Sequence, residues 1–210
     1  DITMTSHSPA EVALASDVVF LALPHNESQA FVADMVGKTK IIDLSADFRL
    51  KNLAAYQNYY GKHNFPHGLS YFTYGFVEAN KAKILTADCI ANPGCFALTT
   101  ELALFPLKSH ISHAAVFAVT GSSGAGKQPK EETHHPIRNH NITSYKIGIH
   151  QHIPEILQTL ELDDSRLTFV PTSGPFTRGI DLTAFIDSKE TISVEGAHQI
   201  YKKYYDNQPF

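Results

Sequence analysis

Two short segments hold residues that could carry out covalent chemistry, and the first contains a cysteine. Asn92-Pro93-Gly94-Cys95 precedes an apolar run at 96–98. Asparagine is a favoured N-cap and proline suits the first helical position, so we predict that a helix starts at Asn92. Cys95 would then lie in the first turn, where unbonded N–H groups and the helix dipole lower the pKa of a thiol and favour the nucleophilic thiolate. The alternative interpretation is a buried and inert cysteine.

The second segment is His150-Gln151-His152, which is followed by Glu155. We expect an extended chain here, which would place both imidazoles on one face. One of them could act as the acid–base partner of Cys95, with Glu155 fixing its tautomer through a hydrogen bond. The sequence does not decide between His150 and His152.

The same histidines could instead belong to a metal-dependent hydrolase, together with His134 and His135. Alternate histidines are a spacing that metal sites can use. However, no Asp, Glu or Cys cluster stands at a matching spacing, so we predict that the chain has no metal site.

Three loops that follow expected strands could bind an anion or a nucleotide. The loop at Leu23-Pro24 and the loop at 43–49 would meet at one sheet edge, where open α/β sheets bind their ligands. Arg49 could grip a carboxylate or a phosphate with two hydrogen bonds. The segment at 121–127 is rich in glycine, but Gln128 stands where a P-loop needs Ser or Thr. This segment remains a candidate for a turn that holds a phosphate.

The composition excludes several classes of protein. The chain has 210 residues, 43% of them hydrophobic, and a formal net charge of -4. It can therefore bury a core in one or two domains, and no basic field favours nucleic acid or an anionic membrane as a partner. The longest apolar stretch, 18–23, is too short to cross a bilayer. Two cysteines make a poor disulfide framework, so we expect a reducing, cytoplasmic setting.

The first half of the chain alternates between predicted helices and predicted strands. Its predicted elements are, in chain order, a helix at 9–15, a strand at 17–23, a helix at 27–36 and a strand at 40–44. This order predicts a βαβ unit with parallel strands, within the later part of a doubly wound, Rossmann-type α/β sheet. We expect residues 51–80 to be mostly irregular, with one short helix, and residues 83–87 to form a strand.

The second half mixes strands and helices without strict alternation, which favours an α+β domain on a mixed sheet. Its predicted elements are strands at 114–120, 145–150, 167–170 and 180–186 and helices at 92–104, 154–160 and 195–205. We divide the chain into residues 1–91, a nucleotide-binding part with a connecting loop region, and residues 92–210, a catalytic and dimerisation domain. The chain begins with Asp and with the alternation already under way, so we expect it to be cut at both ends.

In their order and spacing, several motifs resemble the N-acetyl-γ-glutamyl-phosphate reductase family, within the aspartate-semialdehyde dehydrogenase-like superfamily. The match runs over essentially the whole chain. Its motifs are Phe20-Leu21-Ala22-Leu23-Pro24-His25, Asp43-Leu44-Ser45-Ala46-Asp47-Phe48-Arg49, Tyr74-Gly75, Asn92-Pro93-Gly94-Cys95, Gly124-Ala125-Gly126-Lys127, His150-Gln151-His152 with Glu155, and Arg178-Gly179-Ile180. Asn26 departs from the family pattern, which usually has Gly there.

The resemblance implies an NADPH-dependent reduction of N-acetyl-γ-glutamyl phosphate to the semialdehyde, with release of phosphate, in arginine biosynthesis. Cys95 would form a thioester with the substrate. His150 would be the acid–base group, oriented by Glu155, and His152 would be its substitute. The implied substrate contacts are Arg49, Asn92, His152 and Arg178, and the implied NADP(H) contacts are Leu23, Pro24, Ser45, Ser123 and Gly124.

The resemblance also implies a second domain like the C-terminal domain of glyceraldehyde-3-phosphate dehydrogenase, and a homo-oligomer, either a dimer or a tetramer. The glycine-rich first turn that holds the dinucleotide in this family is missing. We therefore expect the chain alone to bind NADPH weakly and to turn over little. The alternatives are a reductase of the aspartate-semialdehyde dehydrogenase type and an inactive fragment whose property is dimerisation.

Overall fold

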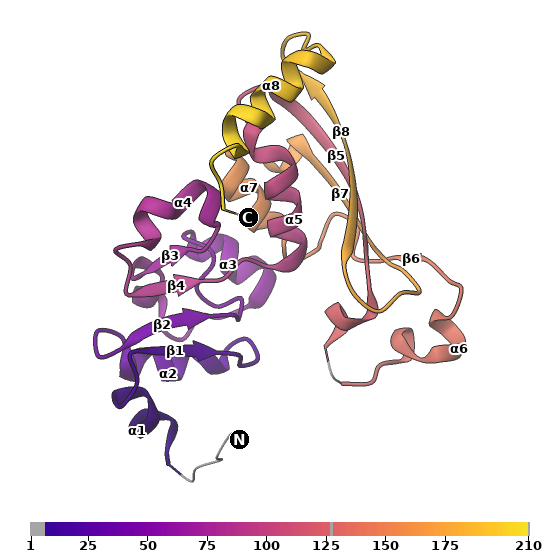
Figure 1. Ribbon diagram of the computed structural model, residues 1–210. Coiled ribbons are helices and arrows are strands. Elements are labelled where there is room, and N and C mark those ends of the chain that lie inside the picture. The colour runs from indigo at the N-terminus through magenta and orange to yellow at the C-terminus, as the bar shows by residue number, and fades with distance from the viewer. Residues whose placement is uncertain (1–6, 127, 210) are drawn as a thin grey trace. The chain divides into compact units, whose positions relative to one another are not determined.

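The computed structural model describes residues 7–126 and 128–209, so Lys127 of the glycine-rich motif lies outside the described residues. The chain divides into two compact units between Pro93 and Gly94, and each is described here by itself (Figure 1). Within the described ranges, no helix is long and apolar enough to cross a membrane.

The first unit is built on a four-stranded parallel sheet with the strand order β1-β2-β4-β3. Its strands are β1 (Val18–Leu21), β2 (Lys40–Asp43), β3 (Phe72–Tyr74) and β4 (Cys89–Ala91). Its helices are α1 (Pro9–Leu14), α2 (Glu27–Met35), α3 (Leu53–Tyr60), α4 (Val77–Ile84) and the 3-10 helix η1 (Pro66–Ser70). Val32 and Met35 of α2 are almost fully buried in one core with Ile41 of β2, so the predicted βαβ unit is confirmed.

The prediction for residues 83–87 was wrong. The helix α4 covers the first two of these positions, and the strand β4 begins later, at Cys89. None of the residues of α4 is buried. The helix therefore has no apolar face whose period could have revealed it in the sequence.

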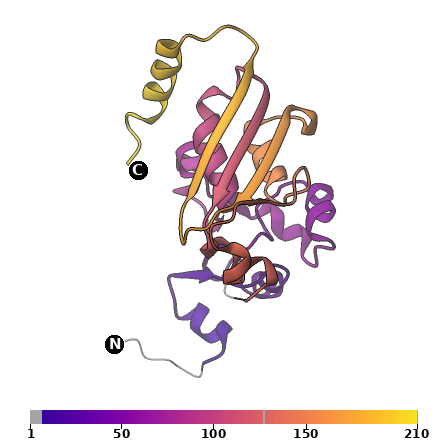
Figure 2. The same cartoon turned by 90° about the vertical axis from the view of Figure 1, so that its right-hand side faces the viewer.

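The second unit is built on a mixed four-stranded sheet with the order β6-β7-β5-β8, in which β5 runs parallel to β7 and antiparallel to β8. Figure 2 shows the three long strands of this sheet side by side. The strands are β5 (Ile111–Thr120), β6 (Thr143–Ser144), β7 (Leu167–Ser173) and β8 (Ile180–Ser188). The predicted combination of an α/β sheet with an α+β domain is confirmed.

Four α-helices accompany this sheet in the described chain, together with short 3-10 helices. They are α5 (Cys95–Leu104), α6 (His135–Arg138), α7 (Ile153–Leu160) and α8 (Val194–Tyr205), with η2 (Phe105–Leu107), η3 (Ser122–Ala125), η4 (Glu131–Thr133) and η5 (Asp164–Arg166). Helices α5 and α7 pack together on one face of the sheet, where Val116 and Ala118 are buried (Figure 1). Alternate side chains of the strands point to the other face. There Phe117 is 42% exposed and Phe185 is 72% exposed, so no helix of the described residues covers these two positions.

The predicted strand at 145–150 was also wrong. The strand β6 covers only Thr143–Ser144. Lys146 and Gly148 then have φ angles of 47° and 72°, in the left-handed region that an extended strand does not use. The two candidate histidines therefore lie in a turn that leads into α7 and not on a straight strand.

Candidate active site

The candidate nucleophile, Cys95, is the first residue of α5, and its N-cap is Gly94. The helix therefore starts later than predicted, because the backbone N–H of Asn92 donates to the carbonyl of Asp43 and continues the sheet. The carbonyl of Gly94 accepts the first helical hydrogen bond, from Leu98 at 2.8 Å. Cys95 is exposed, which excludes the alternative of a buried cysteine. It thus lies at the positive end of the helix dipole and within reach of solvent.

Two side chains from the second candidate segment fix the residue before the nucleophile. The carboxylate of Glu155 is fully buried and accepts a hydrogen bond from the backbone N–H of Gly94 at 2.9 Å. The imidazole of His152 lies so close to Gly94 that a Cβ on this residue would be 2.5 Å from Nε2. The turn that carries Cys95 is therefore held by the hydrogen bond to Glu155 of α7 and by the close contact with the imidazole of His152.

The third member of this segment, His150, is buried among aromatic rings. Its ring lies edge-on to Phe96 at 5.4 Å and to Phe169 at 5.6 Å between centroids. The His150 Nδ1 accepts the backbone N–H of His152 at 3.1 Å, which leaves the proton of the neutral ring on Nε2. Burial and, to a smaller extent, the nearby charges of His152 and Lys146 lower the pKa of His150 to about 3. His150 is therefore a neutral N–H donor at neutral pH.

This depressed pKa makes folding stability depend on pH. In the unfolded chain the imidazole titrates near 6.5, and in the folded chain near 3. Protons therefore bind preferentially to the unfolded chain as the pH falls below 6.5. We expect the free energy of unfolding to fall by about 2 kcal/mol between pH 7 and pH 5 on account of this residue.

Urea unfolding of the wild type and of His150→Gln at both pH values measures this effect. The variant should lose about 2 kcal/mol less than the wild type over the same interval. The same substitution at the exposed His67 serves as the control and should leave the pH dependence unchanged. Equal pH dependence in the wild type and His150→Gln would show that the imidazole is not held neutral by the fold.

The sequence interpretation missed two residues near this site, Tyr145 and Arg138. Burial raises the pKa of the Tyr145 hydroxyl, and the charge of the Cys95 thiolate raises it further, which places this ring beside the nucleophile. The Arg138 guanidinium donates to the hydroxyl of Ser173 and, at 2.6 Å, to the carbonyl of Gly174. It thereby pins the end of β7. No sequence motif marks either residue: Arg138 ends the short helix α6, and Tyr145 follows the strand β6.

The remaining candidate residues of the second unit lie on exposed turns. Ser123 and Gly124 belong to η3, and the Ser123 N–H donates to the carbonyl of Thr177 at 2.9 Å. The side chain of Arg178, next in the chain, is exposed. The Gly121 N–H donates to the Gly179 carbonyl at 3.0 Å, so the glycine-rich turn and the Arg178 turn lie together.

In the first unit, the polar candidates Arg49 and Ser45 are buried, whereas Asn92 is exposed. Arg49 is 8% exposed, and its Nη2 donates to the carbonyl of Leu44 at 2.8 Å. The Ser45 hydroxyl is buried and donates to the Asp43 carboxylate at 2.7 Å. The exposed Asn92 turns its amide to the neighbouring Pro93 carbonyl at 3.3 Å.

The apolar candidates of the first unit lie open at a sheet edge. Leu23 and Pro24 follow β1 and are exposed. The N–H of Leu44, directly after β2, donates to the carbonyl of Leu21 at 2.9 Å, so the loops after β1 and β2 leave from the same edge. An exposed apolar surface at the carboxyl ends of parallel strands fits a nucleotide ring.

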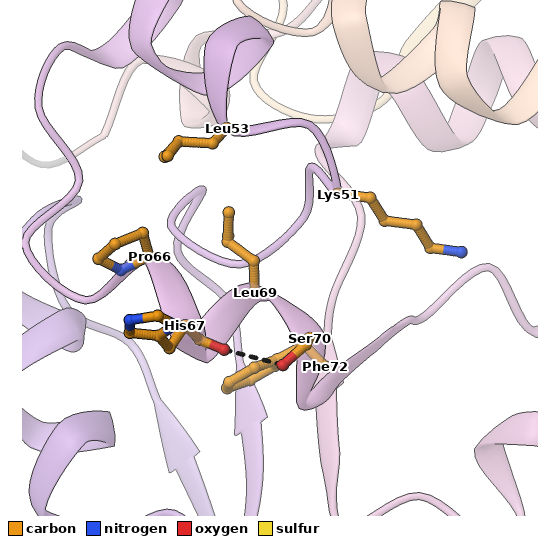
Figure 3. A pocket seen from close by; sticks show the side chains of 7 residues that line it. All are labelled: Lys51, Leu53, Pro66, His67, Leu69, Ser70 and Phe72. Carbon is orange, nitrogen blue, oxygen red and sulfur yellow. Dashed lines mark hydrogen bonds between the residues drawn. The ribbon is translucent and has the colours of Figure 1, made fainter.

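The cavity drawn in Figure 3 does not contain any of these candidates. Its volume is about 550 Å³, and its lining consists of Lys51, Leu53, Pro66, His67, Leu69, Ser70 and Phe72. Among the residues that the structure describes, no group of three or more His, Cys, Asp or Glu side chains could hold a metal ion.

Both units match models of one protein family. Residues 1–87 match the semialdehyde dehydrogenase NAD-binding domain, and residues 95–210 match the semialdehyde dehydrogenase dimerisation domain. The second match alone covers more than half of the chain. The chain belongs to the semialdehyde dehydrogenase family.

Within this family, the chain is similar to N-acetyl-γ-glutamyl-phosphate reductases. It is 41% identical to the enzyme of Azobacteroides pseudotrichonymphae over 92% of the chain and 57% of that protein. It is 37% identical to the enzyme of Methanopyrus kandleri over 100% of the chain and 63% of that protein. This semialdehyde dehydrogenase chain thus spans about three fifths of the length of these curated relatives.

Solved structures of aspartate-semialdehyde dehydrogenases share the fold. The enzyme from Vibrio cholerae has a TM-score of 0.64 and 15% sequence identity, over 90% of this chain and 61% of that one. The enzyme from Francisella tularensis has a TM-score of 0.65 and 10% identity, over 92% of this chain and 64% of that one. These structural similarities establish the semialdehyde dehydrogenase fold but do not identify the substrate.

Proposed function

We propose that this chain carries the thiol chemistry of an N-acetyl-γ-glutamyl-phosphate reductase in arginine biosynthesis. The observation that carries the proposal is the exposed Cys95 at the start of α5, with Glu155 and His152 fixing the preceding residue. The names of the relatives at 36–41% identity supply the substrate. Similarity to aspartate-semialdehyde dehydrogenases is far lower, at 10–15% identity.

The first half of the reaction needs only this chain and the substrate. The Cys95 thiolate attacks the carbonyl carbon of the acyl phosphate, the carbon–oxygen bond to phosphate breaks, and inorganic phosphate leaves with the electron pair. The product is a thioester on Cys95. The exposed Arg178 is our candidate to bind the carboxylate of the substrate, because Arg49 already donates to the Leu44 carbonyl.

The second half needs a hydrogen-bond donor beside the thioester. Bound NADPH supplies the hydride for this reduction. The N–H at Nε2 of the neutral His150 can donate a hydrogen bond to the oxygen of the reduced carbon and stabilise its negative charge. When the carbonyl re-forms, the carbon–sulfur bond breaks, which frees the semialdehyde and the Cys95 thiolate. Leu23 and Pro24 in the first unit, and Ser123 and Gly124 in the second, are the residues that we propose to hold the cofactor.

The acylation half-reaction tests this proposal without any cofactor. Mixing the chain with N-acetyl-γ-glutamyl phosphate should release a burst of about one equivalent of phosphate per chain. Mass spectrometry should then find the acyl group on the peptide that contains Cys95. β-Aspartyl phosphate serves as the matched control and should give a burst at least ten-fold slower. A faster burst with the aspartyl compound would indicate an enzyme of the aspartate-semialdehyde dehydrogenase type, and no burst with either would contradict the proposed function.

We also propose that two copies of the chain associate through the exposed face of the second sheet. The low cysteine content favours a cytoplasmic setting for this assembly. Phe117 and Phe185 lie exposed on this face, on neighbouring strands. An exposed apolar sheet face of this kind is typical of a protein–protein interface. The match to a dimerisation domain supports the same assignment.

The charged variant Phe185→Lys should raise the dimer dissociation constant at least ten-fold, because two ammonium groups would enter an apolar interface. Analytical ultracentrifugation across a concentration series measures this change. Val194→Lys is the control, since Val194 is also exposed but lies on α8. A wild type that stays monomeric at every concentration would contradict the proposed interface.

A further inference from the structure

One buried carboxylate in the first unit, that of Asp47, accepts hydrogen bonds from three other segments of the chain. The backbone N–H of Asn26 donates to both of its oxygens, at 2.9 and 2.8 Å. The hydroxyl of Ser28 donates to Oδ2 at 2.7 Å, and the hydroxyl of Tyr56 donates to Oδ1 at 2.8 Å. Asp47 is fully buried. It therefore joins the loop after β1, the helix α2 and the helix α3 to the loop after β2, away from water.

The backbone of Asn26 gains support from this carboxylate. Its φ angle is 72°, in the left-handed region, which costs most L-residues roughly 1 kcal/mol and asparagine less. Its side chain does not cap a backbone N–H of α2 and accepts instead from the side-chain amide of Gln29 at 3.1 Å. The hydrogen bonds from its N–H to the Asp47 carboxylate thus offset the cost of the turn that leads from β1 into α2. Leu23 and Pro24, the proposed cofactor contacts, lie directly before this turn.

The geometry favours a carboxylate at position 47. Each oxygen of the carboxylate accepts two hydrogen bonds, one from the Asn26 N–H and one from a hydroxyl. The amide of asparagine has nearly the same shape, but its NH2 group cannot accept a hydrogen bond. The Asn26 N–H would then keep one acceptor instead of two, and the hydroxyl that faces the NH2 group would have to turn to its second partner, which is Ser45 Oγ for Ser28 or Asn26 Oδ1 for Tyr56. The carboxylate therefore holds the Asn26 turn more tightly than an amide could.

We propose that Asp47 is a positioning residue that fixes the loop at 22–26 in the conformation that NADP(H) binding requires. It acts through the Asn26 N–H and does not itself touch the nucleotide. The identity of the ligand rests on the proposed function, whereas the fixing of the loop rests on the hydrogen bonds alone.

Hydrogen exchange of Asp47→Asn tests whether Asp47 fixes the loop at 22–26, and titration of the variant with NADPH tests whether this loop conformation is needed for cofactor binding. Amides at 22–28 should exchange at least ten-fold faster in the variant, while those of β2 and β4 should change less than two-fold. A fluorescence titration should give an NADPH dissociation constant at least ten-fold higher than that of the wild type. The phosphate burst at Cys95, which does not use NADPH, should stay at the wild-type rate. Asp34→Asn, the same change at an exposed position of α2, should alter none of these quantities.

The milder variant Ser28→Ala removes one donor and leaves the others, so it keeps the test available if Asp47→Asn unfolds. It should accelerate exchange at 22–28 alone, by about two- to five-fold. Unchanged exchange in this segment, or equal acceleration throughout the unit, would overturn the proposed role of Asp47. Local acceleration with unchanged NADPH affinity would also overturn it. A wild type that does not bind NADPH at all would instead contradict the proposed cofactor site, whatever the exchange shows.

Discussion

Replacing Cys95 by alanine should abolish the phosphate burst, because no other thiol can take over its role. Cys89 is 2% exposed, and burial raises its pKa to about 11, so it is a neutral thiol out of reach of the substrate. We expect the rate of phosphate release to fall to that of spontaneous hydrolysis. The midpoint of urea unfolding should shift little, because an exposed side chain contributes little to stability.

The matched control is Cys89→Ala, which removes the other cysteine of the chain. This variant loses some packing in the core of the first unit but should keep a burst of full amplitude. If Cys95→Ala retained the burst, the nucleophile would have to be another group. If both variants lost it while remaining folded, the acyl group would not be carried by Cys95 alone.

Replacing Gly94 by alanine should slow the burst by roughly 100-fold, the effect of misplacing a reacting group by about 1 Å. The reason is space and not backbone conformation, since Gly94 has a φ of -67°, which any residue adopts. The added Cβ would lie 2.5 Å from Nε2 of His152 and must push the ring or the nucleophile turn away. Overpacking of this kind also destabilises a fold by about 1–3 kcal/mol.

Stopped-flow measurement of phosphate release and urea unfolding together check this prediction. Gly196→Ala is the control, because a Cβ there meets nothing closer than 3.2 Å and the position lies in the helix α8. It should leave the rate of phosphate release unchanged, because its only close contact is with the Ser193 Oγ that caps α8. A wild-type rate in Gly94→Ala would show that the contact with His152 does not set the position of Cys95.

The sequence was sufficient to predict those parts of the fold that leave a local pattern of apolar residues. The buried runs around Ile41 and the apolar spacing that ends at Met35 predicted a βαβ unit, because both faces of a parallel sheet must be covered. The helix α4 left no such pattern, since none of its residues is buried. Asn26 also had a local signal: glycine is usual there in the family, and the left-handed backbone explains that preference.

The candidate site was predictable in its residue types but not in its contacts. Asn92 and Pro93 have the composition of a helix start, yet the sheet takes the N–H of Asn92, and the helix can begin only after Gly94. The hydrogen bond from the Gly94 N–H to Glu155 joins residues 61 positions apart, so no spacing rule could show it. The sequence predicted that Glu155 orients a histidine. The structure shows that its carboxylate accepts a hydrogen bond from the Gly94 N–H, directly before the nucleophile.

The contrast between the two thiols has a consequence for oxidative damage. Peroxide converts an accessible thiolate to a sulfenic acid, which a cell can reverse if a second thiol is near enough to form a disulfide. The buried Cys89 cannot serve as that resolving group, and neither cysteine forms a disulfide in this structure. In this chain, further oxidation of Cys95 would therefore lead to the sulfinic acid unless a small-molecule thiol reduces the sulfenic acid first.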